Sequence, residues 1–419
     1  MRRLRTFLFL LPLLISTGFC LGGDTVKLLA IRATGSHEFN ESEIASASGL
    51  KVNQGIAPAE FKNAADRLAA TGAFAQVGYK YGPLGAGMFV EFQVEDAPQF
   101  LPVRFENFVW NTDDELITKL AERVPLFHGH LPPGGELVDS TLAALQALLS
   151  ERGIVAHAGM RMHSPAAGKS IDAISFYVDG LPLIVKDIEI KNAELVPSSE
   201  VKTALKSIVG MSFERGVVED SIRYRLETLY QSRGLLHATF DPPMVAMTGD
   251  EKNPDIVLKI SLHEGLQYKF GHFQWTGNTL VLVSELNKAI SKCSTGAVAN
   301  LPLLVQGAKY ANGMYMNKGY LESKVQLMPS YDDQNKTVDY ELHVVEGRQF
   351  HMGRITVVGL EASQCEKLQN AWKIKPGEPY DASYEPQFIR EHMNALRGRP
   401  AKTIVTNNPD ATVDVRVEF

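Results

Sequence analysis

The sequence contains few of the residues that build disulfide-rich or membrane-spanning proteins. It has 3 cysteines in 419 residues, and only Cys293 and Cys365 lie beyond the first twenty positions. Two thiols in a chain of this length do not form a disulfide framework. We therefore expect two buried, small apolar side chains, with a single bridge between them as the alternative. After residue 23 no segment is apolar over the roughly 20 residues that a membrane helix needs.

The charge of the chain is small and evenly spread. The 42 basic and 48 acidic residues give a net charge of −6 at pH 7. Nucleic-acid-binding proteins carry a basic stripe or patch, whereas no run of like charge occurs in this sequence. We therefore expect no nucleic acid among the partners.

The first 23 residues have the layout of a secretory signal peptide. Three arginines flank the start of the apolar run TFLFLLPLLIS, and small residues follow in TGFCLGG. This order of basic, apolar and small residues is typical of a cleaved signal. A lipidation site needs a small residue before its cysteine, but Phe19 precedes Cys20, so we expect plain cleavage, with lipidation as the alternative. The mature chain is then expected in the periplasm, without a transmembrane segment.

Motifs that would indicate catalysis or a bound cofactor are also missing. His128 and His130 lie in the loop LFHGHLPPGG without a third ligand nearby, so we expect a surface loop and not a zinc site. The stretch AAGKS at residues 166–170 lacks the first glycine of a phosphate-binding loop, and no G-x-S-x-G motif occurs. We predict a protein without enzyme activity, metal or cofactor.

What the sequence does contain is a repeat with a period of about 80 residues. Its clearest landmark is a glycine between a predicted helix and a predicted strand. Successive glycines are separated by 81, 81, 85 and 79 residues. A glycine just past the last helical turn is typical of a left-handed helix end. We interpret all five as structural glycines: Gly72, Gly153, Gly234, Gly319 and Gly398.

Two further landmarks recur in the same order. A Gly or Asn closes a short strand early in each unit, and an acidic residue ends an alternating strand late in it. Gly and Asn tolerate the positive φ that a sharp exit from a strand often requires. The early positions are Gly35, Asn107, Asn192, Gly277 and Gly359. The acidic positions are Asp96, Asp179, Glu264, Glu346 and Glu418.

Between these landmarks the apolar pattern changes from alternation to helical spacing. Thr112 with Glu115, and Ser363 with Glu366, are typical of capping boxes at the start of a first helix. A second helix with an apolar stripe then follows in every unit. The stripes comprise Phe61, Ala64, Ala65, Leu68 and Ala69; Val138, Leu142, Leu145 and Leu149; Val218, Ile222, Leu226 and Tyr230; Leu304, Ala308, Ala311 and Tyr315; and Ile389, Met393 and Leu396.

These patterns predict an α+β fold, a tandem array of five β-α-α-β-β units. Two helices can cover one face of a three-stranded mixed sheet, which gives a small two-layer domain. Val338, Tyr340 and Leu342 alternate with polar residues, which predicts one buried and one solvated face. After the signal peptide at residues 1–23, we expect the units at residues 26–97, 100–180, 183–265, 268–347 and 350–419.

The unit resembles the POTRA (polypeptide-transport-associated) domain. The resemblance is carried by GEPYDASYEPQFIREHMNALRG, VGMSFERGVVEDSIRYRLETLYQSRGLLHATF and YMNKGYLESKV, and by the strand ends VVEGRQF and LHEGLQY. Five such units in a row are similar to the periplasmic arm of the BamA outer-membrane protein assembly family. In that family the arm precedes a C-terminal membrane β-barrel. Because the sequence stops after TVDVRVEF, we expect a barrel-less relative, or an arm whose gene has lost or split off its barrel.

The predicted sheet leaves one strand free for binding. If the third strand lies between the other two, the second strand becomes an edge with unpaired N–H and C=O groups. An extended chain can add to such an edge by β-augmentation, and the resemblance implies the same mode. The predicted edges are residues 74–80, 154–161, 235–240, 320–327 and 402–406.

We expect the edge of the fourth unit to bind partners, since its pattern is clearest, with a merely solvated edge as the alternative. Its residues are Tyr320, Leu321, Glu322, Ser323, Lys324, Val325, Gln326 and Leu327. The expected function is a non-catalytic periplasmic scaffold of outer-membrane protein assembly or translocation, peripheral to the outer membrane. Its expected partners are unfolded outer-membrane proteins and other assembly subunits. The alternative is a periplasmic adaptor in a secretion or cell-division complex.

Overall fold

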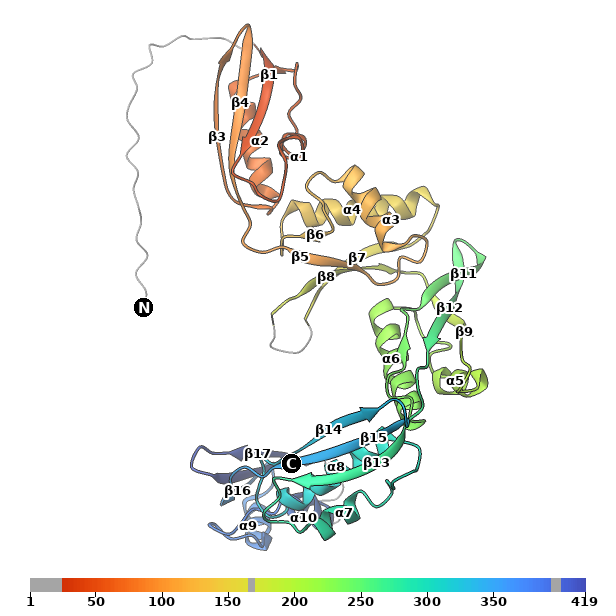
Figure 1. The fold of residues 1–419 in the computed structure, drawn as a ribbon. Coiled ribbons are helices and arrows are strands. Elements are labelled where there is room, and N and C mark those ends of the chain that lie inside the picture. The colour runs from red at the N-terminus through yellow and green to blue at the C-terminus, as the bar shows by residue number, and fades with distance from the viewer. Residues whose placement is uncertain (1–24, 165–169, 393–400) are drawn as a thin grey trace. The chain divides into compact units, whose positions relative to one another are not determined.

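The computed structural model describes residues 25–164, 170–392 and 401–419 (Figure 1). The predicted signal peptide, Cys20, most of the AAGKS stretch, Gly398, Met393 and Leu396 lie outside these residues. The described residues fall into two compact units. One holds those up to Leu183 together with Phe213–Arg215 and Met247–Asp255, and the other holds Ile184–Ser212, Gly216–Ala246 and Ile256–Phe419.

Five sheets, each with two helices, follow one another along the described chain, and we call them modules 1 to 5. Module 1 contains β1 (Val26–Thr34), α1 (Glu41–Ser48), β2 (Gly55–Ile56), α2 (Pro58–Ala70), β3 (Phe74–Leu84) and β4 (Gly87–Asp96). Module 2 contains β5 (Leu101–Phe105), α3 (Asp113–Arg123), β6 (His130–Leu131), α4 (Glu136–Glu151), β7 (His157–His163) and β8 (Ala173–Asp179).

The remaining modules repeat this order of elements (Figure 1). Module 3 contains β9 (Ile184–Lys191), α5 (Ser198–Leu205), α6 (Arg215–Ser232), β10 (Thr239–Phe240), β11 (Met244–Asp250) and β12 (Asn253–His263). Module 4 contains β13 (Lys269–Thr276), α7 (Val283–Ala289), α8 (Leu301–Met316), β14 (Lys324–Asp332) and β15 (Thr337–Val345). Module 5 contains β16 (His351–Val358), α9 (Ala362–Ala371), α10 (Tyr384–His392), β17 (Lys402–Asn407) and β18 (Thr412–Glu418). The predicted α+β class is confirmed, whereas the boundaries of five separate domains stay a prediction.

The last strand of each module lies in the middle of its sheet, which is the condition on which the predicted edges depend. The orders are β1-β4-β3, β5-β8-β7, β13-β15-β14 and β16-β18-β17, and in module 3 β12 pairs with β9, β10 and β11. In module 4, β15 is parallel to β13 and antiparallel to β14. The second strand is therefore an edge strand.

A short additional pairing beside the first strand was missed by the sequence analysis. The two-residue strands β2 and β6 pair antiparallel with the starts of β1 and β5. Single bridges occupy the equivalent place in modules 3 to 5, namely Ile184 with Ser212, Lys269 with Val298 and His351 with Pro379. This pairing covers part of the outer side of the first strand, so the longer free edge is the second strand.

The buried side of each sheet packs against the predicted helical stripes. In modules 3 and 4 every predicted stripe residue is buried, from Val218 to Tyr230 and from Leu304 to Tyr315. In module 1 Ala69 is exposed, and in module 2 Leu142 is only half-buried, so these two positions were wrong. In module 5 the fully buried residue is Phe388, beside the half-buried Ile389.

The two cysteines lie in different hydrophobic cores. Cys293 is buried in the core of module 4, and Cys365 packs against the core of module 5. Both thiols are free. They act as small apolar side chains, and burial raises the pKa of the Cys293 thiol above its ordinary value, which disfavours the reactive thiolate.

One of the two predicted capping boxes is present. The Thr112 side chain accepts a hydrogen bond from the N–H of Glu115, and the Glu115 carboxylate accepts one from the N–H of Thr112. The box at Ser363 is wrong, because α9 already begins at Ala362 and places Ser363 inside the first turn. A box at Asn40 and Glu43 was missed.

Most of the strand-ending Gly and Asn residues adopt the predicted positive φ. Gly35, Asn192, Gly277 and Gly359 have φ values of 100°, 60°, 74° and 91°. Asn107 does not have a positive φ, so that expectation was wrong. Its side-chain amide instead donates to the carbonyl of Val178 at 2.9 Å and accepts from the N–H of Val178 at 2.6 Å. Side-chain bonds thus hold this strand end to the central strand of its sheet.

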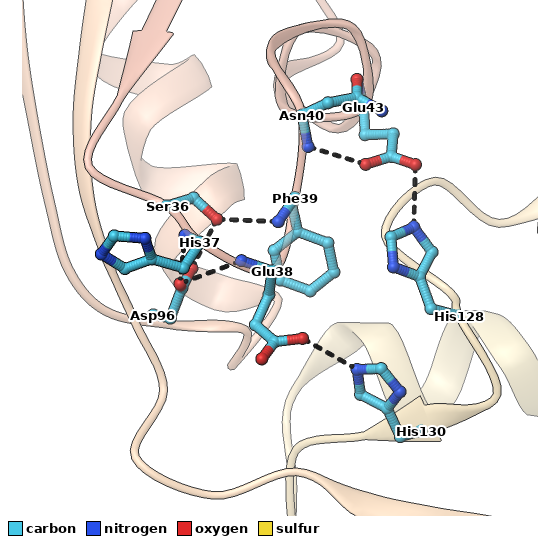
Figure 2. A network of polar contacts seen from close by, with 9 residues as sticks. All are labelled: Ser36, His37, Glu38, Phe39, Asn40, Glu43, Asp96, His128 and His130. Atoms are coloured by element: carbon cyan, nitrogen blue, oxygen red, sulfur yellow. Dashed lines mark hydrogen bonds and ion pairs between the residues drawn. The ribbon is translucent and has the colours of Figure 1, made fainter.

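Three of the acidic landmarks accept hydrogen bonds from the loop that follows the first strand. Asp96 accepts hydrogen bonds from the Ser36 hydroxyl and from the N–H groups of His37 and Glu38 (Figure 2). Glu346 does the same for Thr279 and Leu280. Glu264 accepts from the N–H groups of Glu194, Leu195 and Val196 and from the Tyr230 hydroxyl. These carboxylates are structural, because their bonds satisfy loop donors that would otherwise be unpaired.

Candidate functional site: the edge strand and groove of module 4

The candidate site lies along β14, the edge strand of module 4. β14 pairs with β15 over its whole length, from Lys324 opposite Val345 to Asp332 opposite Thr337. No strand among the described residues pairs with its other side. The outward N–H and C=O groups of β14 are therefore open to an added strand.

The predicted binding segment falls partly in the strand and partly before it. Lys324, Val325, Gln326 and Leu327 are the first four residues of β14. Tyr320, Leu321, Glu322 and Ser323 form the turn that connects α8 to β14. The N–H of Tyr320 still donates to the carbonyl of Tyr315, and that of Ser323 donates to Tyr320. These two hydrogen bonds close the end of α8, so the strand begins only at Lys324. The strand start predicted from the alternation in the sequence was four residues too early.

Pro329 shows which residues of β14 direct their backbone outward. A proline has no N–H, so within a sheet it occupies positions where the N–H would face away from the neighbouring strand. Pro329 lies opposite Tyr340 within the β14–β15 pairing. Backbone direction alternates along an antiparallel edge, so Val325, Leu327 and Tyr331 share the outward direction of Pro329. An added strand finds outward N–H donors at Val325 and Leu327 and loses the next one at Pro329.

A groove of about 470 Å³ runs between α8 and β14. Its apolar floor includes Val305, Met316, Val325 and Leu327, which are all only half-buried. The complete lining is Val305, Ala308, Lys309, Asn312, Met316, Ser323, Lys324, Val325 and Leu327. The Ser323 hydroxyl donates to Oδ1 of Asn312 at 2.9 Å and fixes the polar end of the groove. Side chains of a strand added to β14 would face this floor at every second residue.

The Tyr331 side chain, near the far end of β14, contacts module 3 although it is 38% exposed. The ring of Tyr331 lies 4.4 Å from that of His237 and 5.2 Å from that of Tyr268, measured between centroids. The Tyr268 hydroxyl donates to Asp333 at 2.6 Å. This bond, with burial, raises the pKa of Tyr268 to about 12. Residues 324–328 are the part of the edge that precedes Pro329.

The other predicted edges are also second strands, but they differ in length. Residues 74–80 lie within β3 and residues 402–406 within β17. Of residues 154–161, only those from His157 onward belong to β7. Of residues 235–240, only Thr239 and Phe240 form a strand, β10, and Pro242 and Pro243 follow it. Module 3 thus has an interrupted edge, and the binding role of all five edges stays a prediction.

The structural glycines have the predicted left-handed backbone and a second role that the sequence did not reveal. Gly72, Gly153, Gly234 and Gly319 have φ values of 75°, 68°, 75° and 91°. The carbonyls of Gly234 and Gly319 accept hydrogen bonds from Tyr268 and Phe350 of the following modules, both at 2.8 Å. A Cβ on Gly319 would lie 2.6 Å from the carbonyl oxygen of Phe350. Gly234 and Gly319 therefore also contact the modules that follow them.

The loop with His128 and His130 joins modules 1 and 2 (Figure 2). Nε2 of His128 lies 2.8 Å from Oε1 of Glu43, and Nε2 of His130 lies 3.4 Å from Oε2 of Glu38. The Phe39 ring lies 5.4 Å from the His128 ring. Both histidines are thus partners of carboxylates on module 1, which the sequence analysis did not foresee.

The described part of the chain shows no group of three or more His, Cys, Asp or Glu side chains arranged to hold a metal ion. In the same residues no helix has the length and apolar character needed to cross a bilayer.

The raised pKa values of two buried tyrosines are explained by the packing of the fold. Burial and the bond to Glu264 raise the pKa of Tyr230, and burial raises that of Tyr340.

Comparisons with known proteins agree with this architecture. Residues 268–347, which are module 4, match the POTRA family, described as surface antigen variable number repeat. A putative outer membrane protein assembly factor of Treponema pallidum is 24% identical over 224 residues, covering 52% of this chain and 26% of that protein. The outer membrane protein assembly factor BamA of Neisseria meningitidis is 26% identical over 150 residues, covering 36% of this chain and 18% of that protein.

Solved structures with a similar course of the chain include POTRA domains 3–5 of BamA from Haemophilus influenzae. That structure has a TM-score of 0.48 at 19% identity, and the match covers 57% of this chain and 96% of that one. The chain spans about a quarter or less of the length of the curated relatives that it matches. Module 4 therefore matches the POTRA family, and parts of the chain are similar in sequence to outer-membrane protein assembly factors, BamA among them.

Proposed function

We propose that this protein is a non-catalytic periplasmic scaffold of outer-membrane protein assembly or translocation. It binds unfolded outer-membrane proteins or other assembly subunits by β-augmentation at β14. The observation that carries the proposal is a free edge over residues 324–328 beside an apolar groove. Homology to outer-membrane protein assembly factors supports the same placement.

Strand addition suits a partner that is extended and variable in sequence. The main-chain hydrogen bonds supply affinity and do not depend on the side chains of the guest, whereas a groove beside the edge adds selectivity. Outer-membrane strands alternate between apolar and polar residues. A guest of this kind would direct its apolar side chains toward Val325, Leu327 and Met316 and its polar side chains away from them.

The proposal is tested with a variant that removes one outward donor and leaves the β14–β15 ladder intact. Val325→Pro places at residue 325 the amino acid that the edge already has at Pro329, where it is compatible with the pairing to β15. Val325→Ala is the matched control, since it keeps the N–H and loses the side-chain packing. Binding of a ten-residue peptide of alternating Val and Thr is measured by NMR titration of the mature chain.

We expect Val325→Pro to weaken peptide binding about fivefold or more relative to Val325→Ala, because a net backbone hydrogen bond contributes roughly 0.5–1.5 kcal/mol and the proline ring also obstructs the guest. Equal binding by the two variants contradicts β-augmentation at β14. Absence of binding by the unmodified chain contradicts the proposed function.

A further inference from the structure

The two walls of the module 4 groove carry positive charge and no negative charge. α8 contains Lys309 and no Asp or Glu, and residues 324–328 contain Lys324 and no Asp or Glu. Both lysines line the groove and are exposed. Among the described residues neither ammonium has a carboxylate within 4.0 Å. The nearest acidic residue along the chain, Glu322, is paired with Arg348 at 3.3 Å.

Module 3 has a groove in the equivalent place with the opposite charge. It lies between α6 and β10, has a volume of about 400 Å³ and includes Ile222 and Phe240 in its lining. Its charged residues are Glu219, Glu227, Asp241 and Arg223, and the guanidinium of Arg223 is paired with Asp220. The two grooves share a position in the fold and differ in charge, so positive charge is a property of module 4 and not of the fold.

We propose that the module 4 groove selects extended polypeptide segments that carry Asp or Glu beside large apolar residues on the same face of the strand. This inference rests on the proposed strand addition at β14 and names the chemistry of its guest. A guest strand lies about 4.8 Å from β14 and directs alternate side chains to opposite faces of the sheet. The side chains on one face of the guest enter the groove, where its apolar residues meet the floor and its carboxylates lie within reach of Lys309 on the helix wall and Lys324 at the strand start.

The length of the guest follows from the edge itself. Pro329 removes an outward donor, and Tyr331 is packed against His237 and Tyr268. The ladder is thus limited to residues 324–328, about 17 Å of strand at 3.4 Å per residue. A second copy of this chain paired through β14 is not the expected guest, because its residues 324–328 contain no carboxylate for Lys309 and Lys324.

The test uses the mature chain and three peptides in which threonine occupies every second position. On the other face of the strand, valine alternates with glutamate in the first peptide, with lysine in the second and with serine in the third. Affinities are measured by NMR titration at about 20 mM and about 500 mM NaCl, since exposed ion pairs are screened by salt. The double variant Lys309→Gln with Lys324→Gln is compared with Lys288→Gln, an exposed lysine of α7 outside this groove.

We expect the glutamate peptide to bind about tenfold more tightly than the lysine peptide at low salt, the range that two exposed ion pairs supply. The ratio should approach one in the double variant and at high salt, and should persist in Lys288→Gln. Equal binding of the glutamate and lysine peptides overturns the charge selectivity and leaves strand addition standing. Absence of binding by all three peptides overturns strand addition as well. Self-association of the chain through β14, seen by sedimentation and abolished by Val325→Pro, overturns the assignment of the guest.

Discussion

The carbonyl oxygen of Gly319 accepts a hydrogen bond from the N–H of Phe350 at 2.8 Å, which links the end of α8 to the start of module 5. The carbonyl of Phe350 in turn accepts from the N–H of Tyr380 at 3.0 Å. Gly234 and Tyr268 repeat the arrangement between modules 3 and 4. The landmark glycine therefore ends a helix and also bonds to the first residues of the next module.

Substitution of this glycine is expected to loosen the junction. Gly319→Ala places an L-residue in the left-handed region, which costs about 1–2 kcal/mol, and its Cβ would meet the Phe350 carbonyl oxygen at 2.6 Å. Gly296→Ala is the matched control, since Gly296 has a φ of 84° and open space around its Cβ position. We expect the local free energy of opening, measured by native-state hydrogen exchange at Phe350, to fall at least twice as much for Gly319→Ala as for the control. Equal losses of local stability in the two variants would show that only the left-handed backbone of Gly319 matters, and not its contact with Phe350.

Stability of the α5 region is expected to fall in acid through Glu264. Burial alone raises the pKa of Glu264, but the N–H groups of Leu195, Val196 and Glu194 and the Tyr230 hydroxyl together outweigh burial and lower the pKa below its ordinary value of 4.5. A carboxyl whose pKa is lower in the folded state stabilises the fold above pH 4.5, and this stabilisation disappears as the pH falls through the folded pKa.

The replacement Glu264→Gln separates this contribution from the other carboxyl groups. It is expected to cost roughly 1–3 kcal/mol near pH 7, because the amide leaves loop donors unsatisfied, and to flatten the pH dependence below pH 4.5. Hydrogen exchange at Val196 is the measurement. Asp179→Asn serves as the control, since Asp179 ends its strand in the same way but accepts a bond from Gly180. An unchanged acid dependence in Glu264→Gln would refute the assignment.

The contact between Glu43 and His128 is expected to couple modules 1 and 2 weakly. Their side chains are about a third exposed, and ion pairs or hydrogen bonds at such sites contribute roughly 0.2–1 kcal/mol. A double-mutant cycle of Glu43→Gln and His128→Gln should give a coupling energy in this range. The readout is hydrogen exchange at Val103, whose N–H donates to the carbonyl of Gly129 at 3.1 Å. The exposed pair Lys62 and Asp66 on α2 supplies a control cycle, which should leave exchange at Val103 unchanged.

Much of the fold was predictable because the same local sequence features recur in each successive unit. Gly234 and Gly319 are left-handed helix ends, and Val338 and Tyr340 lie on the buried face that the alternation of β15 predicts. The short pairing of Lys269 with Val298 was not predictable, since two bridged residues leave no periodic pattern. The same holds for Asn107, where a side-chain amide replaces a backbone turn.

The candidate site was predictable only in outline. Sequence alternation indicated an edge strand, but it could not reveal that Tyr320 and Ser323 close the end of α8, because that depends on hydrogen bonds within the turn. The ring contact between Tyr331 and His237 joins residues far apart in the chain, so nothing in the sequence indicated it. The charge of the groove comes from Lys309 and Lys324 on two elements that only the fold brings together.

The most direct test of strand addition is residue-resolved hydrogen exchange of β14 in the mature chain, with and without a saturating alternating peptide. The outward N–H groups of Val325 and Leu327 should exchange fast in the free chain and become protected at least tenfold on binding, while Gln326, already paired with His343, changes little. Protection confined to other strands, or none at Val325 and Leu327 when the peptide is bound, would contradict β14 as the binding edge.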